Sequence, residues 1–502
     1  MDALETLRQD FQAGRIDIDR LFELLASQQR QLQAALKRNA ELEAKLNAPS
    51  TTKIDEPYSL NAEEKRQEAR GKTTKTKKKR KRRGRLKSQD KIDQAERTEP
   101  VFPDGVPHED CQISHTRPVW RLENGRAILI AYQIYRGPNN QYGKIPNVIG
   151  RSEFGLEIVI ELAYLVYISG LSFDKACMML NFFQNLTLKK SQADALLHQL
   201  AKHWEHQFEV LCTLLANSLV VHADETNWSI NSVWALLSEQ ARILLFGVNK
   251  DGETLKKLLD PATFAGLVIS DNAAVYENFT KSQKCWAHLL RKAIKLTLQD
   301  RDNAEYRTFA DRLLEIYYEA CRVQRDGRLG DAGRAKRVAL LDDQILDLCA
   351  PMWLAELPTL VGLEDDFRKL NNEIMEIGIA QELFQFVTTP DVKFANGTTQ
   401  PVAGTNNESE RTLRGPAQAR DTGRTSKTSR GARRQSILMS VLESLRVYLP
   451  TFNLKSVMEE IARWGKTGRS CFETVLQKQK LKLPDEPVLD QIFPQAVPVA
   501  SG

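Results

Sequence analysis

The stretch "NSLVVHADETNW", residues 217–228, joins a strand-like apolar run to two adjacent acids, Asp224 and Glu225. Residues 217–224 are typical of a buried β-strand, and the two acids are expected where that strand ends. A carboxylate at the end of a buried strand is costly unless it is paired, hydrogen-bonded or bound to a cation. Other parts of the chain must therefore neutralise this charge.

The segments that follow continue the pattern and predict a mixed sheet. Residues 232–238 and 241–248 complete a three-stranded meander, and residues 266–271 form a strand that ends in another acid, Asp271. Short helices are expected at 254–260 and 272–279, and residues 284–290 begin as a strand and run into a helix. This order of elements predicts an α/β fold, with helices on the faces of a mixed sheet.

The acids of this sheet suggest a metal site. If their strands are neighbours, Asp224 and Asp271 meet at one edge, where a divalent cation would stabilise both carboxylates. Oxygen ligands of this kind suit Mg²⁺ or Mn²⁺, and two such ions can assist both the attacking and the leaving oxygen of a phosphodiester. A third acid is available at Glu408 or Glu410, in "TNNESERTLR" at 405–414. The alternative for each acid is a helix cap or a surface charge.

The charge of the chain is concentrated in one tract. The 502 residues carry a net charge of +6, and eleven Lys or Arg lie in residues 72–87, so the remainder has +6 − 11 = −5. A tract of this kind attracts polyanions, nucleic acid before anionic membrane, or it is a solvated tail or localisation signal. The candidate DNA contacts in it are Lys77, Lys78, Lys79, Arg80, Lys81, Arg82 and Arg83.

The length of the chain implies two to four domains. Residues 1–47 predict a coiled-coil helix with Asn39 in its seam, or a single amphipathic helix, and residues 48–100 a disordered basic linker. Residues 101–150 are rich in turn residues and are expected to be irregular or to resemble a degenerate zinc ribbon. Their His108, Cys111 and His115 lack a fourth ligand, so zinc is not expected.

Residues 151–215 are expected to be helical. A break at 184–186 is compatible with a helix-turn-helix whose second helix offers Lys189 and Lys190 to DNA, although helical hairpins that bind nothing are commoner. The α/β core is expected at 216–446, with a helical insertion at about 290–400, and residues 447–502 form a helical tail.

Several features bear on the location of the protein. The seven cysteines stand singly, which fits a reducing compartment, and the N-terminal sequence is not typical of a signal peptide. The longest apolar stretch, residues 154–171, contains Glu157 and Glu161, and it is expected to be a buried helix rather than a membrane span.

The segments "HADETNW", "GLVISDNAAVYENF", "CWAHLLRK", "TNNESERTLR" and "SRGARRQSILMSVLES" resemble, in this order, the landmarks of insertion-sequence transposases of the family numbered sixty-six. The resemblance covers about residues 150–450 and implies a DDE transposase with a ribonuclease-H-like core. It matches Asp224, Asp271 and Glu410 to the three catalytic acids, with Glu408 as second choice for the third. The residues that match a C-x-x-H signature are Cys285 and His288, and those placed near DNA phosphates, or on a solvated helix face, are Arg411, Arg414 and Arg424.

The implied activity is Mg²⁺-dependent (or Mn²⁺-dependent) cleavage at transposon ends, followed by joining of the 3′-hydroxyl to target DNA without a covalent protein intermediate. The implied partners are the transposon ends and target duplex, and a second copy of the chain in a homodimer or larger assembly. The resemblance also implies a nucleoid-associated protein of the bacterial cytoplasm. An inactive DNA-binding or repressor protein and a metal-dependent nuclease are the alternatives. Glu225, whose side chain should point to the opposite face of the strand, is expected to tune or cap the site.

Overall fold

The computed structural model describes residues 88–353 and 362–493. All of them belong to the compact unit Lys77–Gly502. The coiled coil predicted for residues 1–47 and the candidate DNA contacts Lys77–Arg83 lie outside the described residues and stay predictions.

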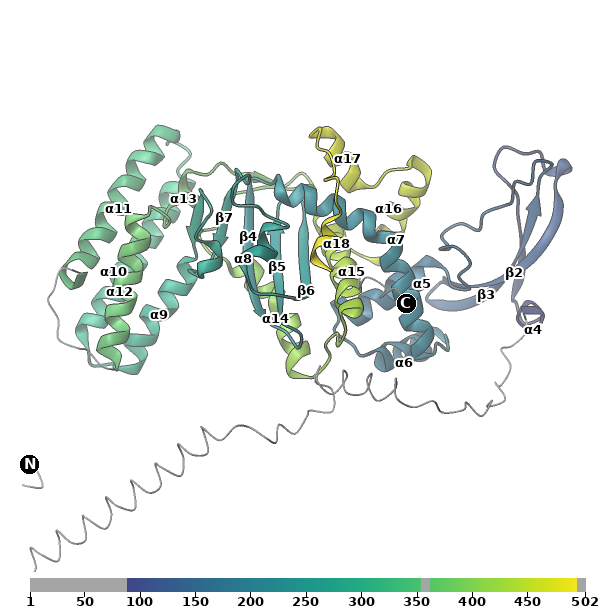
Figure 1. Cartoon of the computed structure of the whole chain (residues 1–502), viewed down its shortest axis with the longest axis horizontal. Coiled ribbons are helices and arrows are strands. Elements are labelled where there is room, and N and C mark those ends of the chain that lie inside the picture. The colour runs from purple at the N-terminus through teal and green to yellow at the C-terminus, as the bar shows by residue number, and fades with distance from the viewer. Residues whose placement is uncertain (1–87, 354–361, 494–502) are drawn as a thin grey trace, which may run out of the picture. The chain divides into compact units, whose positions relative to one another are not determined.

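A five-stranded mixed sheet forms the centre of this unit (Figure 1). Its order is β6-β5-β4-β7-β8, in which β4 pairs antiparallel with β5 and β5 with β6, while β4 pairs parallel with β7 and β7 with β8. The strands are β4 (Val220–Asn227), β5 (Ser232–Ser238), β6 (Arg242–Val248), β7 (Leu267–Ser270) and β8 (Ser282–Lys284). The predicted α/β class and the mixed sheet are therefore confirmed.

Three local predictions in this region differ from the structure. β4 does not end at Asp224 but continues to Asn227, because every residue from Val221 to Asn227 pairs with β5. The helix expected at 272–279 is only a 3₁₀ turn, η3 (Ala274–Tyr276), which follows β7 and brings Tyr276 into the core. The helix expected at 254–260 is the shorter α8 (Gly252–Lys256).

A serine-lined helix covers the β6 edge of the sheet. α15 (Ser429–Tyr448) runs beside β6 (Figure 1) and presents three fully buried serines, spaced four residues apart, to alternate backbone amides of the strand. The amides of Arg242, Leu244 and Phe246 donate to the hydroxyls of Ser444, Ser440 and Ser436 at 2.9, 2.9 and 3.0 Å. The helix thus satisfies polar groups that an edge strand leaves unpaired.

Residues 88–150 are more regular than predicted. They include α4 (Ser88–Ile92) and a second sheet of order β1-β3-β2, formed by β1 (Arg97–Val101), β2 (Gln112–Glu123) and β3 (Arg126–Arg136). The β2–β3 hairpin turns at Asn124 and Gly125, which have φ of 50° and 76°. An Asn-Gly pair is the strongest short hairpin signal, but the many turn residues of the segment favoured an irregular structure instead.

The three candidate zinc ligands of this segment have other contacts. The His108 ring stacks on Phe102 at 3.9 Å between ring centroids, and the Cys111 thiol donates to the Pro107 carbonyl at 3.3 Å. His115 Nδ1 lies 3.1 Å from the Ser114 hydroxyl.

The segment 151–215 is helical, as predicted. It contains α5 (Leu156–Ala163), a π-helical turn η2 (Tyr164–Ile168), α6 (Phe173–Gln184) and the long α7 (Lys190–Ala216). α6 ends at Gln184 and is followed by Asn185 in a left-handed conformation. The second helix was expected to start at Thr187, directly after the break, but α7 begins at Lys190, with Lys189 as its N-cap. α7 packs against α15 and β6, so much of it belongs to the core rather than to a free hairpin.

The chain between β8 and α14 (Asn407–Asp421) forms a helical region with its own apolar core. Its helices are α9 (Trp286–Gln299), α10 (Ala304–Arg325), α11 (Asp331–Trp353), α12 (Leu363–Ile379) and α13 (Gln385–Thr388), followed by the small hairpin β9 (Val392–Lys393) and β10 (Thr399–Gln400). The C-terminal part consists of α16 (Leu454–Thr467), α17 (Cys471–Lys478) and α18 (Val488–Ile492).

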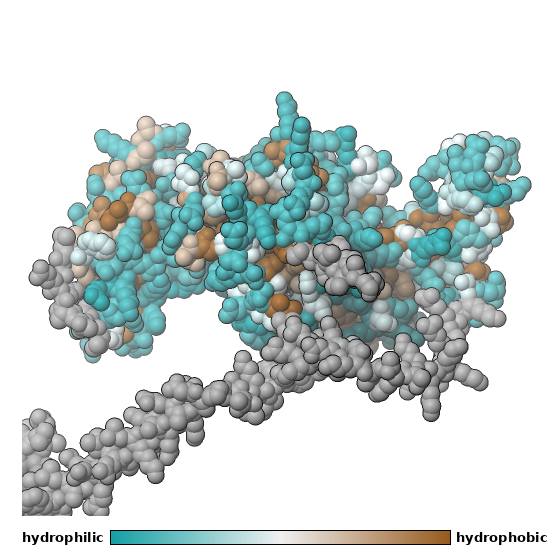
Figure 2. Space-filling view, viewed as in Figure 1, coloured by the Kyte–Doolittle hydropathy of each residue, from teal (hydrophilic) through white to brown (hydrophobic). Residues whose placement is uncertain are grey.

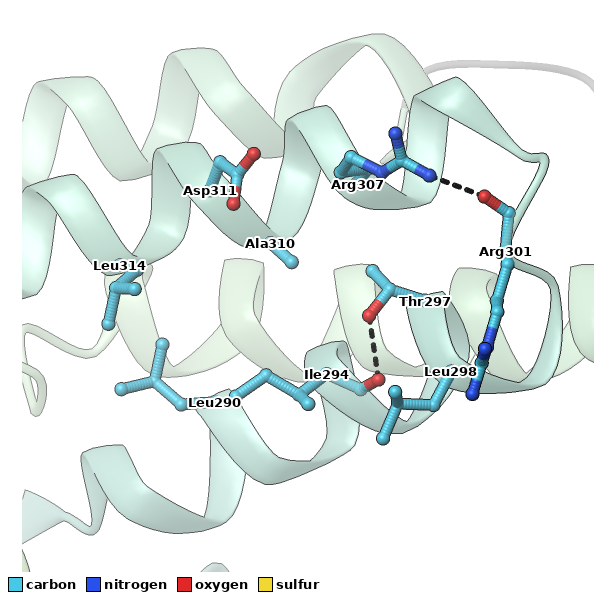
Figure 3. A pocket seen from close by; sticks show the side chains of 9 residues that line it. All are labelled: Leu290, Ile294, Thr297, Leu298, Arg301, Arg307, Ala310, Asp311 and Leu314. Carbon is cyan, nitrogen blue, oxygen red and sulfur yellow. Dashed lines mark hydrogen bonds between the residues drawn. The ribbon is translucent and has the colours of Figure 1, made fainter.

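The surface is predominantly polar in the view of Figure 2, where apolar residues form separate patches. Within residues 88–353 and 362–493, no helix is long and apolar enough to cross a membrane. One apolar cleft, of about 250 Å³, opens between α9 and α10 (Figure 3) and is lined by Leu290, Ile294, Leu298 and Leu314. Its lining also includes Thr297, Arg301, Arg307 and Asp311, and the Arg307 guanidinium donates to the Arg301 carbonyl at one end of the cleft.

Candidate functional site

The parallel pairing of β4 and β7 places two of the predicted acids side by side. The register pairs His222 with Ile269, and Asp224 and Asp271 each lie two residues beyond that pair. Because side chains alternate along a strand, both aspartates leave the sheet on the same face, on strands about 4.8 Å apart. Asp271 directly follows the end of β7, and its carboxylate accepts from the Ala273 amide at 3.1 Å.

A buried asparagine holds the start of α14 beside these strands. Asn406 has no exposed surface, and its side-chain amide donates to the Ala223 carbonyl at 2.7 Å, next to Asp224. Its backbone amide lies 3.1 Å from the Cys285 sulfur, at the N-cap of α9. Asn406 therefore connects β4, α9 and α14 at one point, and the first turn of α14 carries Glu410.

The faces of α14 separate its two candidate acids. Ser409, Leu413 and Pro416 are buried on the side that packs against β4 and β5. Successive helical residues are rotated by roughly 100°, so Glu408 and Glu410 lie on opposite flanks of this buried side. Glu408 forms an ion pair with Arg242 of β6, on the flank away from Asp224.

The pKa of Asp224 reflects the charged groups around it. Burial, together with the negative charges of Glu225, Asp271 and Glu410, raises the pKa of Asp224 to about 7, against the opposing effect of the Glu225 amide. That amide donates to the Asp224 carboxylate at 2.9 Å. A partly buried carboxylate whose neighbours are also carboxylates is an environment that a divalent cation would stabilise, so these residues fit a metal site.

Glu410 lies beside the start of α9, where two residues contact it. Arg291 donates to its two carboxylate oxygens at 3.0 and 2.6 Å, and His288 Nδ1 lies 3.5 Å from it. Ligand atoms of Cys285, His288 and Glu410 all lie within 4.8 Å of one another. Cys285, His288 and Arg291 are spaced three residues apart, at the start of α9. The structure thus brings the C-x-x-H pair to the third candidate acid, and it adds Arg291, which lies within the quoted "CWAHLLRK".

Glu225 points to the other face of β4, as expected, and its environment differs from that of Asp224. Its side chain is only 1% exposed and pairs with Lys250 at 2.7 Å. The buried Tyr276 hydroxyl also donates to it. Neither partner was predicted, because they lie 25 and 51 residues along the chain and no local pattern connects them to Glu225.

The residues predicted to contact DNA occupy different places. Lys189 and Lys190 are exposed at the start of α7, and Arg414 is exposed on the Glu410 flank of α14. Lys190 joins Arg411 and Arg424 in the lining of a groove of about 770 Å³ between α14, α15 and the segment 166–173.

The fold and the site define an α/β protein that gathers carboxylates from β4, from the end of β7 and from α14 at one edge of a mixed sheet. Comparison with protein families then gives the particular identity: the family described as Transposase IS66 family matches residues 151–434, and the chain belongs to this family. The matched span includes Asp224, Asp271 and Glu410. No curated protein matches the chain.

Proposed function

We propose that this protein is a divalent-metal-dependent DNA transposase that cleaves the phosphodiester at transposon ends and transfers the 3′-hydroxyl to target DNA. Membership of a transposase family implies DNA as the partner, and DDE transposases generally use a divalent metal ion. The proposal is supported by the register that places Asp224 beside Asp271 and by the negative charge of Glu410, which acts on the Asp224 carboxyl. The strand order, three antiparallel strands followed by two parallel ones, supports a ribonuclease-H-like core.

In this proposal Asp224, Asp271 and Glu410 hold Mg²⁺ or Mn²⁺. When bound, the metal would activate the attacking oxygen and stabilise the leaving oxygen. The chain contributes the positions of the carboxylates: β4 and β7 set the two aspartates in register, and Asn406 sets the start of α14. Arg291 has a side chain that is 55% exposed, so it can leave Glu410 and turn to a DNA phosphate when a cation takes its place.

The test compares Asp224→Asn, Asp271→Asn and Glu410→Gln with the wild-type protein on duplexes that carry the ends of the element. We expect all three variants to bind these duplexes with wild-type affinity and to lose Mg²⁺-dependent cleavage. Glu408→Gln is the matched control, because it lies two residues from Glu410 on the other flank of α14, and it should cut.

Cleavage by either aspartate variant at the wild-type rate would overturn the proposal. If Glu408→Gln loses cleavage and Glu410→Gln keeps it, the third acid is Glu408. Specific binding by a wild-type protein that never cuts would instead indicate the repressor alternative. Assembly into a dimer through residues 1–47 stays a prediction, and sedimentation of the full chain beside a chain that lacks these residues tests it.

A further inference from the structure

A basic groove lies on the flank of α14 opposite to Glu410. We call it the arginine groove; it has a volume of about 770 Å³ and is lined by Lys190, Arg242, Arg411, Arg424, Arg434 and Arg446. The acids in its lining are Glu408 and Glu443, so its formal charge is +6 − 2 = +4. Apart from the tract at 72–87 the chain has a net charge of −5, and the groove is therefore a local exception to an acidic protein.

Two of these cations are structural. Arg434 is only 12% exposed, donates to the Tyr167 hydroxyl at 2.7 Å, pairs with Asp194 and covers the Phe173 ring. Arg242 is 16% exposed and pairs with Glu408. Because Glu408 and Asp194 already pair with these two arginines, we assign both to the walls of the groove and not to ligand binding.

The rim carries cations that can receive a ligand. Arg411 and Arg424 are exposed, and Arg424 also donates to the Gly170 carbonyl, which joins the loop after α14 to the segment 166–173. Arg446 is 45% exposed, and its partner Glu443 lies at 3.4 Å, one helical turn away. The Arg446 guanidinium also lies over the Phe452 ring, 5.1 Å from the ring centroid. An exposed ion pair of this kind contributes little, so the guanidinium can receive a stronger anion from the groove side.

The lining between these cations is partly apolar and also contains serine, threonine and glutamine side chains. Its apolar part includes Ile168, Leu171, Leu244, Pro416, Ala419 and Met439. A cationic rim above an apolar floor suits a ligand with phosphates on one side and flat apolar faces on the other, which is the chemistry of an unpaired nucleic-acid strand. The volume lies in the range of sites that enclose compact ligands, about 300–1,000 Å³, and so fits one or two nucleotides rather than a rigid duplex.

We propose that the arginine groove binds an unpaired segment of DNA strand next to the cleavage site. This inference rests on the proposed function for its orientation: Glu410 occupies one flank of α14 and the groove the other, so a strand that leaves the acids and crosses the helix meets Arg411 and then the groove. Arg411 and Arg446 bind its phosphates, and the apolar floor receives its bases.

The experiment measures DNA binding without cutting, in full-length protein that carries Asp224→Asn and Asp271→Asn. Fluorescence anisotropy with a labelled single-stranded oligonucleotide, over a range of salt concentrations, compares Arg411→Gln/Arg446→Gln with the control Arg312→Gln/Arg322→Gln. The control arginines lie on α10, outside the groove, and each has a glutamate partner three residues away, as Arg446 does. All variants keep the basic tract at 72–87, so differences between them report the groove.

We expect the groove variant to bind single strands more weakly. The slope of log K against the logarithm of salt concentration should be smaller by about 1.4, because two phosphate contacts are lost and each contributes about 0.7 for a single strand. The control pair should match the parent. Equal weakening of single-strand and blunt-duplex binding would overturn the assignment to unpaired DNA, and unchanged binding would remove the site. Displacement of the oligonucleotide by polyglutamate at equal charge would indicate an acidic protein ligand instead. Because the assay needs no cleavage, its outcome is separate from that of the proposed function.

Discussion

Asn406 is the residue whose removal should most directly separate the catalytic acids. Asn406→Ala deletes the side-chain amide that donates to the Ala223 carbonyl at 2.7 Å, in a site with no exposed surface. A buried acceptor that loses its donor costs about 1–3 kcal/mol, and the space left by the missing amide group adds about 1 kcal/mol. We therefore expect the free energy of local opening at β4 to fall by about 2–4 kcal/mol, so that the open state is populated roughly 30- to 700-fold more.

Native-state hydrogen exchange of the β4 amides, residues 220–227, measures this loss directly. The variant should also cut more slowly, because the anchor between β4 and the start of α14 is gone while Asp224, Asp271 and Glu410 are intact. Asn407→Ala is the control, since Asn407 is the exposed neighbour in the same helix. If Asn406→Ala exchanges and cuts like the Asn407 variant, then Asn406 does not position the acids, and the account of the site given above is wrong.

Three further outcomes follow from named contacts. Ser440→Ala leaves the buried Leu244 amide without its acceptor and should lower the free energy of unfolding by about 1–3 kcal/mol in urea denaturation, whereas the exposed Ser429→Ala should not. Tyr276→Phe removes a hydrogen bond to the buried Glu225 carboxylate and should cost about 1.5–3 kcal/mol by the same measurement; a midpoint equal to that of the wild type would contradict a buried charge there. Because the pKa of Asp224 is raised to about 7, the metal-free protein binds this proton more tightly when folded, and the resulting stability is lost as the pH rises from about 4 to 7. The melting temperature of the wild type should therefore fall relative to that of Asp224→Asn over this range, and a constant difference would refute the raised pKa.

The local pattern of apolar residues was enough to predict β5, β6 and β7. β5 begins and ends at the predicted residues, β6 begins one residue later than predicted, and β7 is one residue shorter than predicted at each end. Where the prediction of β4 failed, at Glu225, the cause was nonlocal. An acid in a buried strand is tolerated here because Lys250 and Tyr276 arrive from distant parts of the chain, and no window around residue 225 contains them.

The sequence by itself determined β5, β6 and β7, the candidate acids and their order along the chain, because alternation and residue type are local properties. It left open which acids meet. Only the tertiary structure decided that Asp224 and Asp271 share a register, that Glu410 lies on their side of α14, and that Glu408 turns to Arg242. The physical reason is that the approach of two charges depends on how β4, β7 and α14 pack, and a shift of two residues along a helix moves a carboxylate to the other flank.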